Sequence, residues 1–130
     1  MTIRIEHVAL WTDDLERSRS FYVEHLEARA SELYRNETTG FASYFLELDG
    51  GSRLELMQMP GIASRAAEGA QELGFVHIAF SLGGEAAVDA KTEELRRVGC
   101  AVLDGPRWTG DGYYESVVLD PDGNRIELTV

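Results

Sequence analysis

The sequence contains an internal duplication, and this feature restricts the possible folds more than any other. Residues 53–56 read Arg-Leu-Glu-Leu and residues 125–128 read Arg-Ile-Glu-Leu, each after an apolar stretch and a turn. Each half also opens with an alternating apolar segment that carries one histidine, His7 or His77. The histidines are 70 residues apart and the glutamates of the two tetrapeptides are 72 apart. This nearly constant offset predicts two copies of a module of about 55 residues, too long for a solenoid repeat.

The order strand, helix and three strands is predicted for each half, since apolar alternation indicates strands and end signals bound the helices. In the first half the expected strands are 3–11, 28–35, 43–48 and 53–59, around a helix that Asp13 or Asp14 caps and that runs to about Leu26. In the second half they are 75–82, 101–107, 113–119 and 125–130, around a helix from about Glu85 to Val98 that ends at Gly99. The modules therefore span about 1–59 and 75–130, with a linker at 60–74 that has room for a helical turn.

Strand parity places four polar side chains on equivalent faces of the two halves. Because side chains alternate along a strand, a residue next to an apolar row points away from the helix. The apolar rows expected to pack on the helices are Val8 and Leu10; Leu54 and Leu56; Val76, Ile78, Phe80 and Leu82; and Ile126 and Leu128. His7, Glu55, His77 and Glu127 then share the opposite faces. A lone histidine or glutamate on a strand is usually structural or solvated, but repetition in register favours a common site if the halves face each other.

Two imidazoles and two carboxylates form a set of metal ligands that prefers divalent transition-metal ions. With a divalent cation the set has zero net charge, and it suits Ni²⁺, Co²⁺, Zn²⁺, Mn²⁺ or Fe²⁺. Four protein ligands leave up to two positions of an octahedron for water or for substrate oxygens. The pattern therefore favours a catalytic metal site over a closed structural one.

Three motifs resemble the vicinal oxygen chelate superfamily, which includes glyoxalase I, extradiol dioxygenases, fosfomycin-resistance enzymes and bleomycin-binding proteins. The motifs are IEHVALWTDDLERSRSFY at 5–22, GFVHIAFSL at 74–82 and YYESVVLDPDGNRIEL at 113–128. The resemblance implies an α+β fold in which two βαβββ modules form an open, cupped mixed β-sheet around a central metal cleft. The order His, Glu, His, Glu is most similar to glyoxalase I, the lactoylglutathione lyase.

The resemblance also implies a mechanism and roles for the four residues. His7, Glu55, His77 and Glu127 would bind one divalent ion, with Ni, Co or Zn as the leading candidates. The reaction would convert the hemithioacetal of a 2-oxoaldehyde and a thiol to a 2-hydroxyacyl thioester, by proton transfer through a metal-stabilised enediolate. Glu127 would be the base, and Glu55 would be a ligand or the base for the opposite stereoisomer.

Two positions depart from the glutathione-using members of the family. These usually carry an arginine four residues after the first ligand and often an asparagine four residues after the second, where this chain has Trp11 and Met59. Both replacements are apolar and weaken the case for glutathione as the thiol. The arginines considered as substitute anion contacts, each more simply a surface residue, are Arg35, Arg53, Arg65 and Arg107.

Six large side chains are expected either to line an apolar substrate pocket around the metal or to pack in an interface between modules or subunits. The set consists of Trp11, Phe45, Met57, Met59, Trp108 and Tyr113. Glu115 is expected to face either the cleft or the solvent, because the nearby turn disturbs its parity. The alternative functions are a non-catalytic binding protein like the bleomycin-resistance members, and a dioxygenase or thiol transferase of the same superfamily.

The composition argues against nucleic acid and membrane partners and predicts a cytoplasmic protein. The 130 residues carry 23 acidic and 12 basic side chains, a formal charge of −11, which argues against nucleic acid and anionic membranes as partners. The N-terminal segment becomes acidic too early for a signal peptide, and no apolar run approaches 18 residues. The single cysteine, Cys100, excludes an internal disulfide and is typical of a reducing cytoplasm. A cytoplasmic homodimer acting on a small molecule is expected, the dimer by analogy with the family.

Overall fold

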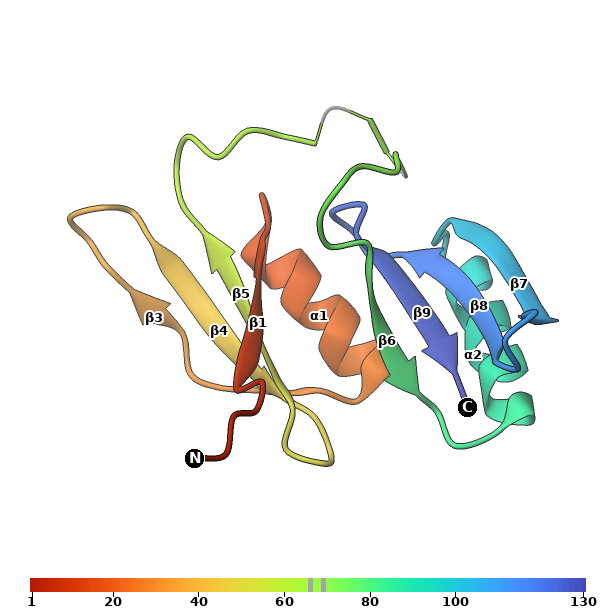
Figure 1. The fold of residues 1–130 in the computed structure, drawn as a ribbon. Helices are drawn as coiled ribbons and strands as arrows, with labels where there is room; N and C mark the ends of the chain where they lie inside the picture. Colours follow the sequence, from red (N-terminus) through yellow and green to blue (C-terminus); the bar gives the residue numbers. More distant parts are fainter. Residues whose placement is uncertain (66, 69) are drawn as a thin grey trace. The chain divides into compact units, whose positions relative to one another are not determined.

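Strand β1 (His7–Trp11) opens the first unit, Met1–Ser64, of the computed structural model, which describes residues 1–65, 67, 68 and 70–130. It is followed by α1 (Leu15–Leu26), β2 (Arg29–Ala30), β3 (Tyr34–Arg35), β4 (Ala42–Glu47) and β5 (Arg53–Gln58). Figure 1 labels these elements except the two-residue strand β2. Strand β5 lies between β1, which runs parallel to it, and β4, which runs antiparallel. The other edge of β4 pairs with the short strands β2 and β3.

The second unit, Arg65–Val130, has the same connectivity except that the single strand β7 (Val102–Trp108) follows its helix where the first unit has the two short strands β2 and β3. Its other elements are β6 (His77–Ser81), α2 (Glu85–Arg97), β8 (Tyr114–Leu119) and β9 (Arg125–Thr129). The strand order is β6-β9-β8-β7, and the first strand again runs parallel to the last (Figure 1). The predicted α+β class, built from two βαβββ modules, is confirmed.

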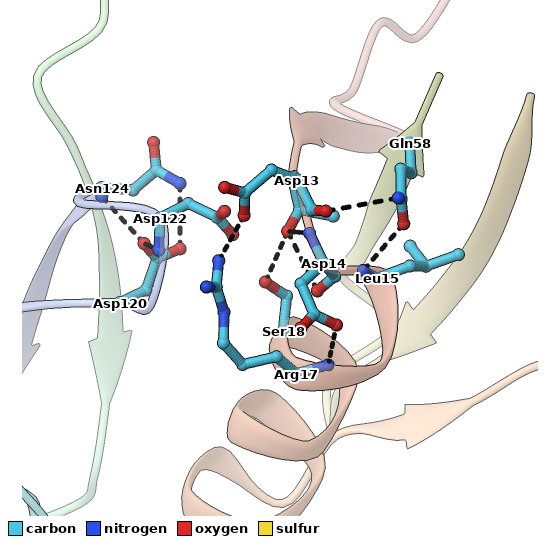
Figure 2. Close-up of polar contacts among 10 residues, drawn as sticks. Asp13, Asp14, Leu15, Arg17, Ser18, Gln58, Asp120, Asp122 and Asn124 are labelled. Carbon is cyan, nitrogen blue, oxygen red and sulfur yellow. Dashed lines mark hydrogen bonds and ion pairs between the residues drawn. The ribbon is translucent and has the colours of Figure 1, made fainter. Parts of the chain in front are cut away.

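Helix α1 begins at a well-defined polar cap. The Asp14 side chain accepts a hydrogen bond from the backbone N–H of Arg17 at 3.0 Å, and the N–H of Leu15 donates to Gln58 Oε1 at 2.9 Å (Figure 2). These bonds satisfy backbone donors that have no partner inside the helix. Asp14, and not Asp13, is therefore the capping residue, and Gln58 fixes the start of the helix to the end of β5.

Each unit has its own core between the helix and one face of the sheet. The buried apolar residues of the first unit include Leu15, Phe21, Tyr22, Leu26, Leu46, Leu54 and Leu56. Those of the second unit include Phe80, Val88, Leu95, Val118, Ile126 and Leu128. Each such side chain contributes about 1.5–3 kcal/mol when it is removed from water. The predicted helix-facing rows of β5 and β9 are confirmed, and they leave the opposite sheet faces to other side chains.

The opening strands are shorter than the sequence predicts, and both begin at their histidine. Strand β1 pairs with β5 from the His7–Arg53 register onward, and residues before His7 would lie beside the turn at 49–52. Strand β6 begins at His77 for the same reason: it pairs with β9 from the His77–Arg125 register onward, and the turn at 120–124 precedes β9. Val76 therefore precedes the strand and is 48% exposed, so the expectation that it packs on the helix was wrong. The strand predicted at 28–35 is divided into β2 and β3.

The predicted linker contains the boundary between the two units, which falls between Ser64 and Arg65. Its described residues include no helix. The segment 60–74, for which a helical turn was considered, includes positions 66 and 69, which lie outside the described residues. In the part of the chain that the structure describes, no helix is both long and apolar enough to span a bilayer.

Candidate functional site

In the first unit, the sheet face opposite α1 brings His7 and Glu55 together. Parallel pairing sets Glu55 of β5 beside Ala9 of β1, so its side chain shares the face of His7. His7 Nε2 lies 3.6 Å from Glu55 Oε1, and the Glu55 side chain is only 17% exposed. The first half of the predicted donor set is therefore adjacent in space.

The second unit repeats this arrangement. Glu127 of β9 pairs with Ala79 of β6, which matches the Glu55–Ala9 register of the first unit. His77 Nε2 lies 3.2 Å from Glu127 Oε2, and the Glu127 side chain is 15% exposed. Equivalent strands thus place the same two residue types at the same position of each unit.

The separations between donor atoms fit a metal ion. An ion at about 2.0–2.2 Å from each donor would hold two neighbouring donors roughly 3.0–3.4 Å apart. The separations of 3.2 and 3.6 Å are close to this range. Among the described residues, no group of three or more His, Cys, Asp or Glu side chains is placed to hold a metal. Each unit by itself therefore offers one pair of donors.

A polar network surrounds His7 on its other side. His7 Nδ1 is hydrogen-bonded to a carboxylate oxygen of Glu6, and the Arg53 guanidinium donates to the other oxygen. Arg53 also lies 4.4 Å from the centre of the Phe45 ring, which in turn meets the His7 ring edge-on at 5.3 Å. The hydrogen bonds from His7 and from Arg53 lower the pKa of the Glu6 carboxyl below its ordinary value.

Glu115 lies beside Glu127 and has a strongly shifted pKa. Val117 is the register partner of Glu127, so Glu115, two residues earlier on β8, shares its sheet face. Its hydrogen bond to Glu127, followed by burial and by the charge of Glu127, raises the pKa of Glu115 to about 7. Its Oε2 is buried and has no hydrogen-bond partner among the described residues. Of the two orientations open for Glu115, the structure places it on the site face.

The predicted pocket residues divide between the two sides of their sheets. In the first unit, register pairing puts Phe45, Trp11 and Met57 on the face of His7, while Met59 follows the end of β5. Trp11 is partly exposed and meets Phe41 edge-on.

In the second unit, Trp108 pairs with Tyr114, whose hydroxyl donates to Asp89 of α2 at 2.6 Å. Trp108 is therefore on the helix side, away from the face of His77. Tyr113 lies just before β8 and is exposed.

No role was expected for Glu6, and Arg53 was expected to be a surface residue or a substitute anion contact. The signal for Glu6 was present, because a carboxylate directly precedes the first histidine while the second is preceded by Val76. Arg53 is the register partner of His7, which becomes visible only when β1 and β5 are paired.

A cavity of about 280 Å³ lies on the helix side of the first unit, around the start of α1 and the end of β5. Its lining includes Asp13, Glu16, Gln58 and Arg35, which was considered as an anion contact, but none of the predicted metal ligands or pocket residues. This cavity is therefore separate from the candidate site.

Two βαβββ modules, each with a histidine and a glutamate paired on the open sheet face, define the class to which this protein belongs. Residues 4–128 match the family described as the Glyoxalase/Bleomycin resistance protein/Dioxygenase superfamily, and the chain belongs to that superfamily. A relative in Bacillus subtilis strain 168, the uncharacterized protein YwkD, is 30% identical, with 95% of this chain and 94% of YwkD covered.

Solved structures share the fold over nearly the whole chain. A glyoxalase family protein from Enterococcus faecalis is 25% identical with a TM-score of 0.79, covering 98% of this chain and 97% of that one. The trypanothione-dependent glyoxalase I of Leishmania major is 24% identical with a TM-score of 0.76, covering 98% and 86%. The fosfomycin resistance protein FosX of Listeria monocytogenes is 21% identical with a TM-score of 0.72, covering 100% and 93%. The superfamily thus includes enzymes that act on small molecules, and some of its members use divalent metals.

Proposed function

We propose that this protein is a metal-dependent isomerase of the glyoxalase I type. It would convert the hemithioacetal of a 2-oxoaldehyde and a thiol to a 2-hydroxyacyl thioester. The observation that carries the proposal is the His–Glu pair on each unit, at equivalent register and with donor separations of 3.6 and 3.2 Å that suit a shared ion. A binding protein without catalysis has no need for two such pairs.

The ligands of the ion would be His7, Glu55, His77 and Glu127, with Ni²⁺, Co²⁺ or Zn²⁺ as the preferred ions. The two pairs belong either to one chain or to two copies in a homodimer. When bound, the ion supplies Lewis-acid stabilisation for negative charge that develops on adjacent substrate oxygens. The protein contributes the neutral overall charge of this site and the fixed positions of its donors.

Glu127 would act as the base. Its carboxylate takes the proton from the carbon that bears the hydroxyl and the sulfur, and the electrons of that C–H bond move onto the substrate oxygens. The same carboxyl then gives the proton to the neighbouring carbon, so the substrate is isomerised with no net oxidation. Glu55, at the equivalent place in the first unit, is the ligand or the base for the opposite stereoisomer.

The thiol of the substrate is proposed to differ from glutathione. Trp11 and Met59 stand where glutathione-using members carry polar side chains, and Trp11 lies on the same sheet face as His7. The Leishmania relative is itself described as trypanothione-dependent, so the fold accommodates more than one thiol. A less polar or less anionic thiol than glutathione fits both residues and the net charge of −11.

Glu127→Gln tests the proposal directly. Protein freed of metal by a chelator is reloaded with Ni²⁺, Co²⁺ or Zn²⁺, and thioester formation is followed with methylglyoxal and a panel of low-molecular-weight thiols. The variant is expected to retain metal but to lose at least roughly 100-fold in kcat, since general base catalysis contributes at least that much. Glu93→Gln, on α2, where this glutamate forms ion pairs with Arg96 and Arg97, is the matched control and should behave like the wild type.

Three results would contradict the proposal. Full turnover by Glu127→Gln would remove its role as base. If the wild-type protein binds metal but converts none of the thiol adducts, the proposed metal site stands and the proposed reaction is excluded. A wild-type protein that takes up no metal but binds a cationic drug would favour the bleomycin-resistance type of function.

A further inference from the structure

The two histidines of the proposed site have different surroundings. His7 Nδ1 is hydrogen-bonded to Glu6, whereas the residue before His77 is Val76, whose side chain cannot accept a hydrogen bond. In the part of the chain that the structure describes, the polar contact of His77 is the one between its Nε2 and Glu127. The duplicated modules therefore differ at the atom that controls which ring nitrogen carries the proton.

A carboxylate at Nδ1 determines the tautomer of a neutral imidazole. An ionised carboxylate only accepts hydrogen bonds, so Nδ1 must be the protonated nitrogen and Nε2 keeps its lone pair. The distance of 3.6 Å from His7 Nε2 to Glu55 Oε1 is beyond hydrogen-bond range, which agrees with an unprotonated Nε2. In metal sites, a partner of this kind orients the ring and increases the basicity of the ligating nitrogen.

Arg53 fixes Glu6 in this role. The guanidinium binds the carboxylate oxygen that His7 does not use, and its plane is held over the Phe45 ring at 4.4 Å. Phe45 also meets the edge of the His7 ring. The equivalent of Arg53 in the second unit is Arg125, but the equivalents of Glu6 and Phe45 are valines, so this network is specific to the first unit.

We propose that Glu6, held by Arg53, is a positioning residue that keeps His7 in the Nδ1–H tautomer and so presents the Nε2 lone pair for metal binding. This inference rests on the proposed metal site. His7 is then ready to bind in the metal-free protein, whereas His77 lacks this bias and is ordered by the ion.

The tautomers are measured in ¹⁵N-labelled, metal-free protein at a pH at which the imidazoles are neutral. Long-range ¹H–¹⁵N spectra distinguish the two nitrogens of each ring, and His25→Ala and His77→Ala variants assign the three histidines. We expect His7 to be predominantly Nδ1–H in the wild type and to lose this preference in Glu6→Ala, while His77 is unchanged. Zn²⁺ affinity of Glu6→Ala should fall by roughly 10–100-fold.

Glu47→Ala is the matched control. Glu47 is exposed on β4, pairs in register with Arg53, and its loss changes the charge by the same amount. It should alter neither the His7 tautomer nor Zn²⁺ affinity by more than about twofold, so that a general charge effect is separated from the hydrogen bond.

A His7 that is Nε2–H in the wild type, or that keeps its tautomer in Glu6→Ala, would overturn the inference. An equal loss of affinity in Glu6→Ala and Glu47→Ala would also overturn it. If the wild-type protein shows the expected tautomers but binds no Zn²⁺, the proposed function is contradicted, and so is the role of Glu6 in metal binding. The hydrogen bond from His7 to Glu6 would then be the one part of the inference that remains.

Discussion

At the scale of single residues, the carboxylates of this protein differ through their neighbours. Glu6 receives hydrogen bonds from His7 and Arg53, which stabilise its charged form. Glu115 faces Glu127, so its neutral form is favoured, and its pKa rises to about 7. Glu6, beside a histidine of one proposed pair, and Glu115, beside a glutamate of the other, are thus driven toward opposite protonation states.

The raised pKa of Glu115 predicts a pH dependence of stability in the metal-free protein. The folded state binds this proton more tightly than the unfolded state, so the stabilising contribution is complete below about pH 4.5 and is lost as the pH rises through about 7. Glu115→Gln keeps a neutral side chain, and we expect it to increase the free energy of unfolding at pH 8 by about 1 kcal/mol. At pH 5.5 the effect should be much smaller.

Urea unfolding in the presence of a chelator measures this difference. Glu24→Gln, an exposed position on α1, is the control and should have no pH-dependent effect. A Glu115→Gln variant that is less stable than the wild type at pH 8 would show that the Glu115–Glu127 contact is not the dominant interaction.

At the scale of elements, parity and register determine which side chains meet. The apolar rows of β5 and β9 could be read from the sequence, because alternation needs only the strand itself. The start of β1 at His7 could not be read from the sequence, because it depends on the residue at which the partner strand β5 begins after its turn. Trp108 shows the same limit: a bulged strand shifts its register, so its face follows from its pairing with Tyr114.

Strand β7 contains the irregular register, and Gly105 lies within it. Its φ is +76°, and an added Cβ would meet the backbone oxygen of Glu115 and lie 3.0 Å from Ser116 Cα. We expect Gly105→Ala to decrease the free energy of unfolding by about 2 kcal/mol or more, through backbone strain and the displacement of β8.

Gly110→Ala is the control for this substitution, because an added Cβ there meets no atom within 4 Å. Thermal or urea unfolding compares the two variants. Equal stability of Gly105→Ala and the wild type would mean that β7 and β8 approach each other less closely than described.

At the scale of the whole molecule, duplication accounts for the two matching His–Glu pairs on which the proposed site rests. Each unit folds around its own core and presents one histidine and one glutamate, and each by itself lacks the ligands of a four-donor centre. Superfamily membership and the donor pairs could be predicted from the sequence, because both follow from the repeated motifs. The Glu6 network could not, since it depends on the pairing of β1 with β5 and on the position of Arg53.

The stoichiometry of Zn²⁺ binding distinguishes one ion shared by both His–Glu pairs from a separate ion at each pair. Metal-free wild type, His7→Ala, His77→Ala and the control His25→Ala are titrated with Zn²⁺ in a calorimeter, and bound metal is checked by elemental analysis. With a shared four-ligand site, the wild type and His25→Ala bind one ion per chain. A shared site also predicts affinity at least roughly 100-fold weaker in both His7→Ala and His77→Ala, because each removes a ligand of the same ion. No binding by the wild type, or two ions per chain of which each variant loses one, would contradict a shared four-ligand site.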